Sequence, residues 1–199
     1  MPKLPSLIPQ YMRAIVLPAP SQSPQALQLR SVPVDMPTGR QILVKVAACA
    51  VAYRDILDRK GAFPFIKRPT VLGHEFAGVV AAAGPDAHEF HVGQRVVSLH
   101  WAQRDAWPSP LQVSQSAFFS FAAHALCVLK QRVTQGNAAV SSMLGLMCNG
   151  GYAEYCTVDE SAFVDAPSGW SAVDAAPVMS TFGTVWQGAF VRGGATRDR

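Results

Sequence analysis

The chain has 199 residues, of which 49% are hydrophobic and 15% are charged, so it can form one well-packed domain and does not have the composition of a disordered chain. Its formal net charge of +4 comes from 17 basic and 13 acidic residues spread along the sequence, which excludes the basic block of a nucleic-acid-binding protein. The longest apolar run, 117–129, is shorter than the roughly 20 residues of a membrane-spanning helix, so no membrane partner is expected.

Runs of apolar and β-branched residues predict a chain that is mainly β with a few helices. Residues 41–47 alternate Ile42, Val44 and Val46 against Leu43 and Lys45, which is the period of a half-buried strand. Further strands are expected at 76–83, 95–99 and 152–158. Glycines at the ends of these runs supply the turns between strands.

Two helical stretches interrupt the strands. The first is expected at about 53–60, where Gly61 and Pro64 stop it. The second begins near Ser171, which forms a capping box with Asp174, and Pro177 breaks it after about one turn. The continuation is predicted at about 178–190.

The segment at about 101–141 does not fit its surroundings. It contains no Asp, Glu, Lys or Arg between Trp107 and Leu129. We interpret it as sequence substituted by mis-splicing or by an error in gene prediction, and the alternative is a lineage-specific apolar loop or dimer contact.

The four cysteines of the chain are Cys49, Cys127, Cys148 and Cys156. They have no CxxC spacing, and the proline-rich start of the chain does not form a secretory or transit helix. Buried thiols in a reducing compartment, the cytoplasm, are therefore expected.

Residues 73–87 carry the most specific motif. Gly73-His74-Glu75 is followed by two residues and Gly78, and then by Gly84 and Ala87 after further fixed spacings. The pattern resembles the zinc-site signature of medium-chain alcohol dehydrogenases, and the similarity extends over 41–65, 73–97 and 150–167. The chain thus resembles the medium-chain dehydrogenase/reductase family.

This resemblance implies a GroES-like, partly open antiparallel barrel at 1–172, including the atypical segment at about 101–141. Residues 173–199 are then a helix and a linker leading to a missing Rossmann domain. No G-x-G-x-x-G fingerprint occurs in the chain, so NAD(P), the cofactor of the full-length family, is not expected to bind this chain alone.

The resemblance also implies a zinc site made by two cysteines and the motif histidine. Ala52 and Ser180 occupy the two cysteine positions, which leaves only His74 and Glu75 as metal-ligand candidates. A catalytic zinc takes about three protein ligands and prefers thiolate to hydroxyl, so a tight zinc is not expected here. With Cys127 alone in the 101–141 segment, the structural zinc of zinc-type relatives is not expected either.

By the same resemblance, Asp55 orients His74, and Arg54 replaces the Ser or Thr that relays a proton. Tyr53, Asp55, His74 and Glu75 are the catalytic candidates, with Tyr53 as donor to a substrate carbonyl, and Thr184 is the cofactor-binding candidate. Alternatively, His74 and Glu75 persist only as a polar pair at the barrel surface.

The predicted function is a truncated alcohol dehydrogenase-like oxidoreductase domain that is inactive alone. Its parent reaction is NAD(P)-dependent oxidoreduction of an alcohol or carbonyl, or of a quinone or enone. The alternatives are a non-enzymatic GroES-like partner-binding module and a fragment of a longer zinc-independent reductase. Without a final stretch of chain from beyond the Rossmann domain, exposed apolar surface is expected to cause self-association.

Overall fold

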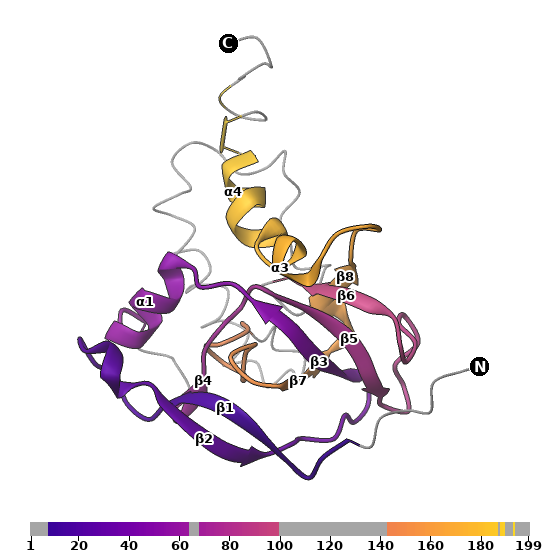
Figure 1. The fold of residues 1–199 in the computed structure, drawn as a ribbon, viewed down its shortest axis with the longest axis horizontal. Coiled ribbons are helices and arrows are strands. Elements are labelled where there is room, and N and C mark those ends of the chain that lie inside the picture. Colours follow the sequence, from indigo (N-terminus) through magenta and orange to yellow (C-terminus); the bar gives the residue numbers. More distant parts are fainter. Residues whose placement is uncertain (1–7, 64–67, 100–142, 187, 190–192, 194–199) are drawn as a thin grey trace, which may run out of the picture.

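Two antiparallel β-sheets form the body of the protein (Figure 1). The computed structural model describes residues 8–63, 68–99, 143–186, 188, 189 and 193. One sheet has three strands in the order β2-β1-β4: β1 at Tyr11–Leu17, β2 at Gln28–Pro33 and β4 at Thr70–Val71. The other has five strands in the order β7-β3-β5-β6-β8: β3 at Gln41–Cys49, β5 at Phe76–Ala83, β6 at Arg95–Ser98, β7 at Tyr155–Asp159 and β8 at Phe163–Asp165.

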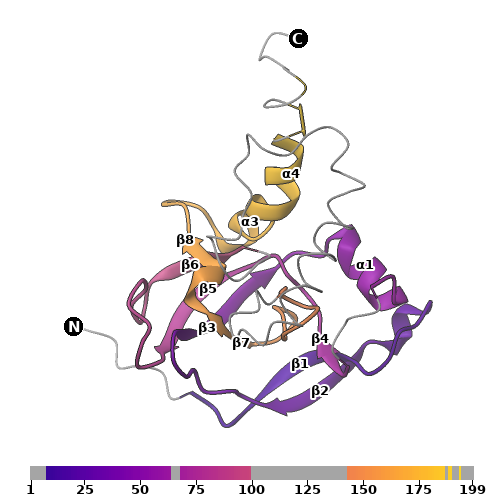
Figure 2. The same cartoon turned by 180° about the vertical axis from the view of Figure 1, so that it is seen from behind.

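The two sheets remain open instead of closing into one barrel, and the predicted mainly β fold is confirmed. The 3-10 turns η1 at Pro24–Ala26 and η3 at Glu160–Ala162 complete the β-rich part. Figure 2 shows from behind how β1 and β2 form one end of the molecule, away from the C-terminal helices. No helix among the described residues is long and apolar enough to cross a membrane.

Strand β3 is the central element of the larger sheet. It pairs with β5 on one side and β7 on the other, so its backbone groups are satisfied along both edges. Ile42 and Val44 pack into the main core with Phe76 and Phe163, whereas Leu43 faces a smaller apolar cluster on the opposite side. The side chains of 42–44 therefore alternate between the two faces of the strand, as the sequence predicts, but both faces are buried here.

The predicted strand at 152–158 begins later in the structure, at Tyr155. Tyr152 and Ala153 instead contact β1, through a hydrogen bond from the Ile15 N–H to the Tyr152 carbonyl (2.8 Å) and a bridge between Ala14 and Ala153. These two residues join the sheets, and their pairing partner is too distant in sequence for a local pattern to indicate it.

Helix α1 (Tyr53–Lys60) has the bounds that the sequence predicts. It ends at Gly61, which has a φ of 81° in the left-handed region that glycine adopts readily. At its start Ala52 has no side-chain acceptor, and the Asp55 carboxylate accepts the Ala52 N–H instead (2.8 Å).

The C-terminal helical stretch consists of three short pieces. They are α3 at Ala172–Ala175, the π-helical turn η4 at Val178–Phe182 and α4 at Gly183–Trp186. The Ser171 hydroxyl caps α3 by accepting the Asp174 N–H (3.2 Å), and α3 ends before Pro177, where the sequence predicts a break. The π-helical form of the next turn was not predicted. The predicted continuation at 178–190 is described through Trp186, and at 188 and 189. The predictions for 101–141 and Cys127 lie outside the described residues.

Candidate active site

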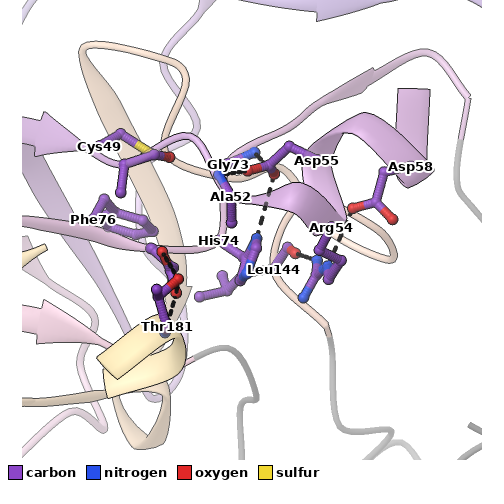
Figure 3. Close-up of polar contacts among 12 residues, drawn as sticks. Cys49, Ala52, Arg54, Asp55, Asp58, Gly73, His74, Phe76, Leu144 and Thr181 are labelled. Carbon is purple, nitrogen blue, oxygen red and sulfur yellow. Dashed lines mark hydrogen bonds and ion pairs between the residues drawn. The ribbon is translucent and has the colours of Figure 1, made fainter. Parts of the chain in front are cut away.

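Asp55 is the centre of a buried hydrogen-bond network (Figure 3). One carboxylate oxygen accepts the Ala52 N–H, and the other lies 3.2 Å from the Gly73 N and 3.3 Å from the His74 Nδ1. Asp55 is 4% exposed and His74 is 2% exposed. Burial by itself raises the pKa of Asp55, but the bond and charge of His74, the Ala52 N–H and the Arg54 charge outweigh it and leave the pKa below its ordinary value.

The backbone of the Gly-His-Glu loop is fixed from β6. Ser98 donates its hydroxyl to the His74 carbonyl (2.9 Å) and accepts the Phe76 N–H (2.9 Å). Gly73 has a φ of 89°, and a Cβ there would lie 2.5 Å from the Tyr152 ring and 2.8 Å from the Cys49 sulfur. The loop therefore needs glycine at this position and is held in one conformation.

Glu75 contacts the C-terminal helical stretch. Its carboxylate accepts the Thr181 backbone N–H (2.5 Å) and the Thr181 hydroxyl (2.8 and 2.9 Å to the two oxygens). Glu75 is 2% exposed. Both carboxylate oxygens of Glu75 thus accept hydrogen bonds from Thr181.

These residues do not fit a zinc ion. Ala52 has no donor atom, Ser180 offers a neutral hydroxyl, and Glu75 is occupied by Thr181. Among the described residues, no group of three or more His, Cys, Asp and Glu side chains lies close enough to hold a metal. A catalytic zinc needs about three protein ligands, so we derive no step through a metal.

The other candidates lie around this network. Tyr53, the first residue of α1, is 72% exposed, and Thr184 is exposed in α4. Arg54 turns away from solvent, donating to the Asp58 carboxylate (3.1 Å) and to the Leu144 carbonyl. The structure thus brings Asp55 and His74 into contact, joins Glu75 to Thr181, and leaves Tyr53 and Thr184 on the surface.

Cys49 lies at the end of β3, packed against the main core, and burial followed by the charges of Asp55 and Glu75 raises its pKa strongly. Such a thiol remains protonated at neutral pH and is a poor nucleophile. Cys156 is also buried with a raised pKa, so the expectation of packed thiols holds for both residues.

Sequence reasoning missed Thr181, Ser98 and Tyr152. Tyr152 covers Gly73, and burial of its hydroxyl, followed by the charge of the nearby Asp55, raises the pKa of Tyr152. The only feature of the sequence that could have indicated Tyr152 is its place directly after Gly150 and Gly151. Thr181 and Ser98 contact the motif across 106 and 22 residues of sequence, beyond any local pattern.

Asp58, which pairs with Arg54, is expected to make the free energy of unfolding depend on pH. Burial raises the pKa of Asp58 from 3.8 to about 6, against the opposing effect of Arg54. Because the folded pKa lies above the unfolded one, the stability associated with neutral Asp58 is lost as pH rises between these values. Asp58→Asn is therefore expected to raise the free energy of unfolding by about 2 kcal/mol at pH 8 and by little at pH 3.

Urea denaturation at the two pH values measures this difference. The exposed Asp86→Asn is the matched control, expected within about 0.5 kcal/mol of wild type at both pH values. A fall in stability at pH 8 in Asp58→Asn would show that the ion pair, and not its desolvation, dominates.

Comparisons of this chain with known proteins identify a family. A family model described as "Alcohol dehydrogenase GroES-like domain" matches residues 38–168. Acryloyl-coenzyme A reductase from Sulfurisphaera tokodaii is 35% identical over 107 residues, covering 54% of this chain and 31% of the relative. A zinc-type alcohol dehydrogenase-like protein from Schizosaccharomyces pombe is 26% identical over 178 residues, covering 89% of this chain and 41% of the relative.

The fold has matching solved structures as well. An NAD-dependent alcohol dehydrogenase superposes with a TM-score of 0.70 at 28% identity, covering 92% of this chain and 48% of that one. The chain thus spans less than half the length of each of these relatives. Because the family model covers most of the chain and the strands agree with solved members, this protein belongs to the alcohol dehydrogenase GroES-like family of medium-chain dehydrogenases.

Proposed function

We propose that this chain is the substrate-side domain of a zinc-independent, NAD(P)-dependent reductase. The proposal rests on one observation at the Gly-His-Glu loop: the polar contacts of the site are present, but the thiolate ligands of a zinc ion are not. The Asp55–His74 contact is present at 3.3 Å, while Ala52 and Ser180 lack thiolates and Glu75 is bound to Thr181. Such a site can orient a substrate by shape and hydrogen bonds but cannot polarise it with a metal.

An activated double bond or carbonyl, as in an enone, a quinone or an enoyl thioester, is the substrate class that this site suits best. Such a group accepts a hydride without a Lewis acid because its own carbonyl stabilises the developing charge. The 35% identity to an acryloyl-coenzyme A reductase over 107 residues supports this choice over a simple alcohol. Tyr53, exposed at the start of α1, is the proposed hydrogen-bond donor to the substrate carbonyl, and Asp55 holds His74 as a neighbouring polar group.

The nicotinamide supplies the hydride in this family, and these residues do not form its binding site. The dinucleotide fingerprint is absent from the 199 residues, so we expect no NAD(P) binding by this chain alone. We propose 1–172 as the GroES-like domain and 173–199 as the connection to a nucleotide-binding domain. Thr184 then faces that domain from α4. We also propose the cytoplasm as its location, since the described cysteines are thiols.

Zinc content of the purified chain, measured by mass spectrometry after dialysis against buffered zinc, tests the proposal. We expect far less than one zinc per chain, and about one in the Ala52→Cys/Ser180→Cys double variant, because two thiolates and His74 then make a three-ligand set. Ala52→Ser, which adds an oxygen but no thiolate, is the control and is expected to stay empty.

Stoichiometric zinc in the wild type would refute the zinc-independent assignment. Zinc in neither protein would show that the loop and the π-helical turn do not face one shared position, and would remove the basis for the family's site in this chain.

A partner-binding module is the second candidate function, and one surface favours it. A groove beside α3 is lined mostly by apolar side chains, with Asp174 among them, and Trp170, Val173 and Phe182 are 47, 72 and 59% exposed. Light scattering across a concentration series tests self-association through this face. Concentration-dependent growth that Phe182→Ser abolishes would support self-association through this groove, whereas a monomer at all concentrations would exclude it.

A further inference from the structure

The segment after Pro177 is attached to the sheet differently from the segment before it. Ala175 and Ala176 pack against Ala77 and Val97, so α3 is docked by small apolar side chains. Beyond Pro177, Met179 and Phe182 are exposed, and the hydrogen bonds to the sheet side converge on one carboxylate, that of Glu75. The attachment therefore changes from apolar packing to a polar link.

The π-helical turn η4 makes this link possible. In an α-helix the Thr181 N–H would donate to the carbonyl of Pro177, four residues back. Here the Phe182 N–H takes that carbonyl instead (3.1 Å), which is the five-residue spacing of a π-helix. The Thr181 N–H is thereby released, and it donates to Glu75 at 2.5 Å.

We propose that Thr181 is a positioning residue that fixes the Glu75 carboxylate and that the π-helical turn is the backbone arrangement that allows it. Backbone N–H and hydroxyl together occupy both oxygens of a side chain that is 2% exposed. The link joins the Gly-His-Glu loop to the residue next to Ser180 without a shared metal. This inference does not depend on the substrate or on any reductase activity.

Amide NMR and hydrogen exchange on the full chain test the link directly. Thr181→Val keeps the side-chain volume but removes the hydroxyl, and we expect the amide at position 181 to exchange about tenfold faster, because one charge-assisted hydrogen-bonding group is lost. Thr181→Ser keeps the hydroxyl and is expected to restore the wild-type rate. Glu75→Ala is expected to shift the amide proton of residue 181 upfield, as the short bond to a carboxylate is lost.

Thr184→Val makes the same chemical change three residues later, in the exposed part of α4, and is expected to leave the amide at 181 unchanged. Amides of β5 serve as the reference for global unfolding. The proposal is overturned if the amide at 181 keeps its shift and its exchange rate in both Thr181→Val and Glu75→Ala. It is also overturned if β5 amides accelerate equally, since the hydroxyl would then support the whole fold and not this link.

Discussion

Gly150→Ala is expected to prevent folding or to lower the free energy of unfolding by more than about 4 kcal/mol. A Cβ at this position would lie 2.0 Å from the Gly73 carbonyl oxygen and 2.7 Å from that of Leu72. Both contacts are with backbone atoms, so no side-chain rotation relieves them. The two segments cannot separate cheaply, because the Gly150 N–H donates to Val71 (2.8 Å) and the Gly151 N–H to Gly73 (2.7 Å).

Thermal and urea denaturation of the purified variant measure this effect. Gly183→Ala is the matched control, since Gly183 has a helical φ of −59° and an added Cβ would meet its nearest atom, the Val178 oxygen, at 3.5 Å. Alanine there is expected to raise stability by up to about 1 kcal/mol, because it restricts the unfolded chain and favours helix. A Gly150→Ala variant that melts like wild type would mean that 71–73 and 150–151 are not packed backbone to backbone.

Asp55→Ala is expected to lower the free energy of unfolding by about 3–5 kcal/mol, because it leaves several buried donors without their acceptor. The Ala52 and Gly73 N–H groups and the His74 ring all contact this one carboxylate, which is 4% exposed. Asp55→Asn keeps one acceptor oxygen, and its free energy of unfolding is expected to lie between those of the wild type and Asp55→Ala. The exposed Asp86→Ala is the control, expected within about 0.5 kcal/mol of wild type.

The stability lost in Asp55→Ala is also expected to depend on pH, which gives a second test. The folded pKa of Asp55 lies below its ordinary value of 3.8, so its contribution is fully present above that value and is lost as pH falls through the folded one. Unfolding curves of wild type and Asp55→Ala should therefore converge under strongly acidic conditions. A gap that stays constant from neutral pH to below the folded pKa would show that packing, and not the charged hydrogen bonds, accounts for the loss.

Local sequence was sufficient wherever neighbouring residues decide the structure. Helix α1 matches its predicted bounds because Gly61 ends it and Asp55 caps it from within the first turn. Strand β5 matches residue for residue. The pairing of β1 with β2 was not predicted, because the long connection 18–27 separates the two strands and nearly all of β2 is exposed. Within the site, His74 and Asp55 could be paired from the family resemblance, whereas Ser98 and Thr181 could not.

The sequence by itself determined the mainly β architecture, the family and the missing thiolates, because each depends on residue type at a fixed spacing. The tertiary structure decided what Glu75 does. Its partner Thr181 lies 106 residues away, and the bond exists because a π-helical turn releases one N–H beside a buried carboxylate. A buried charge must find donors wherever the fold brings them, and that choice is made by packing across the whole chain and not by any local pattern.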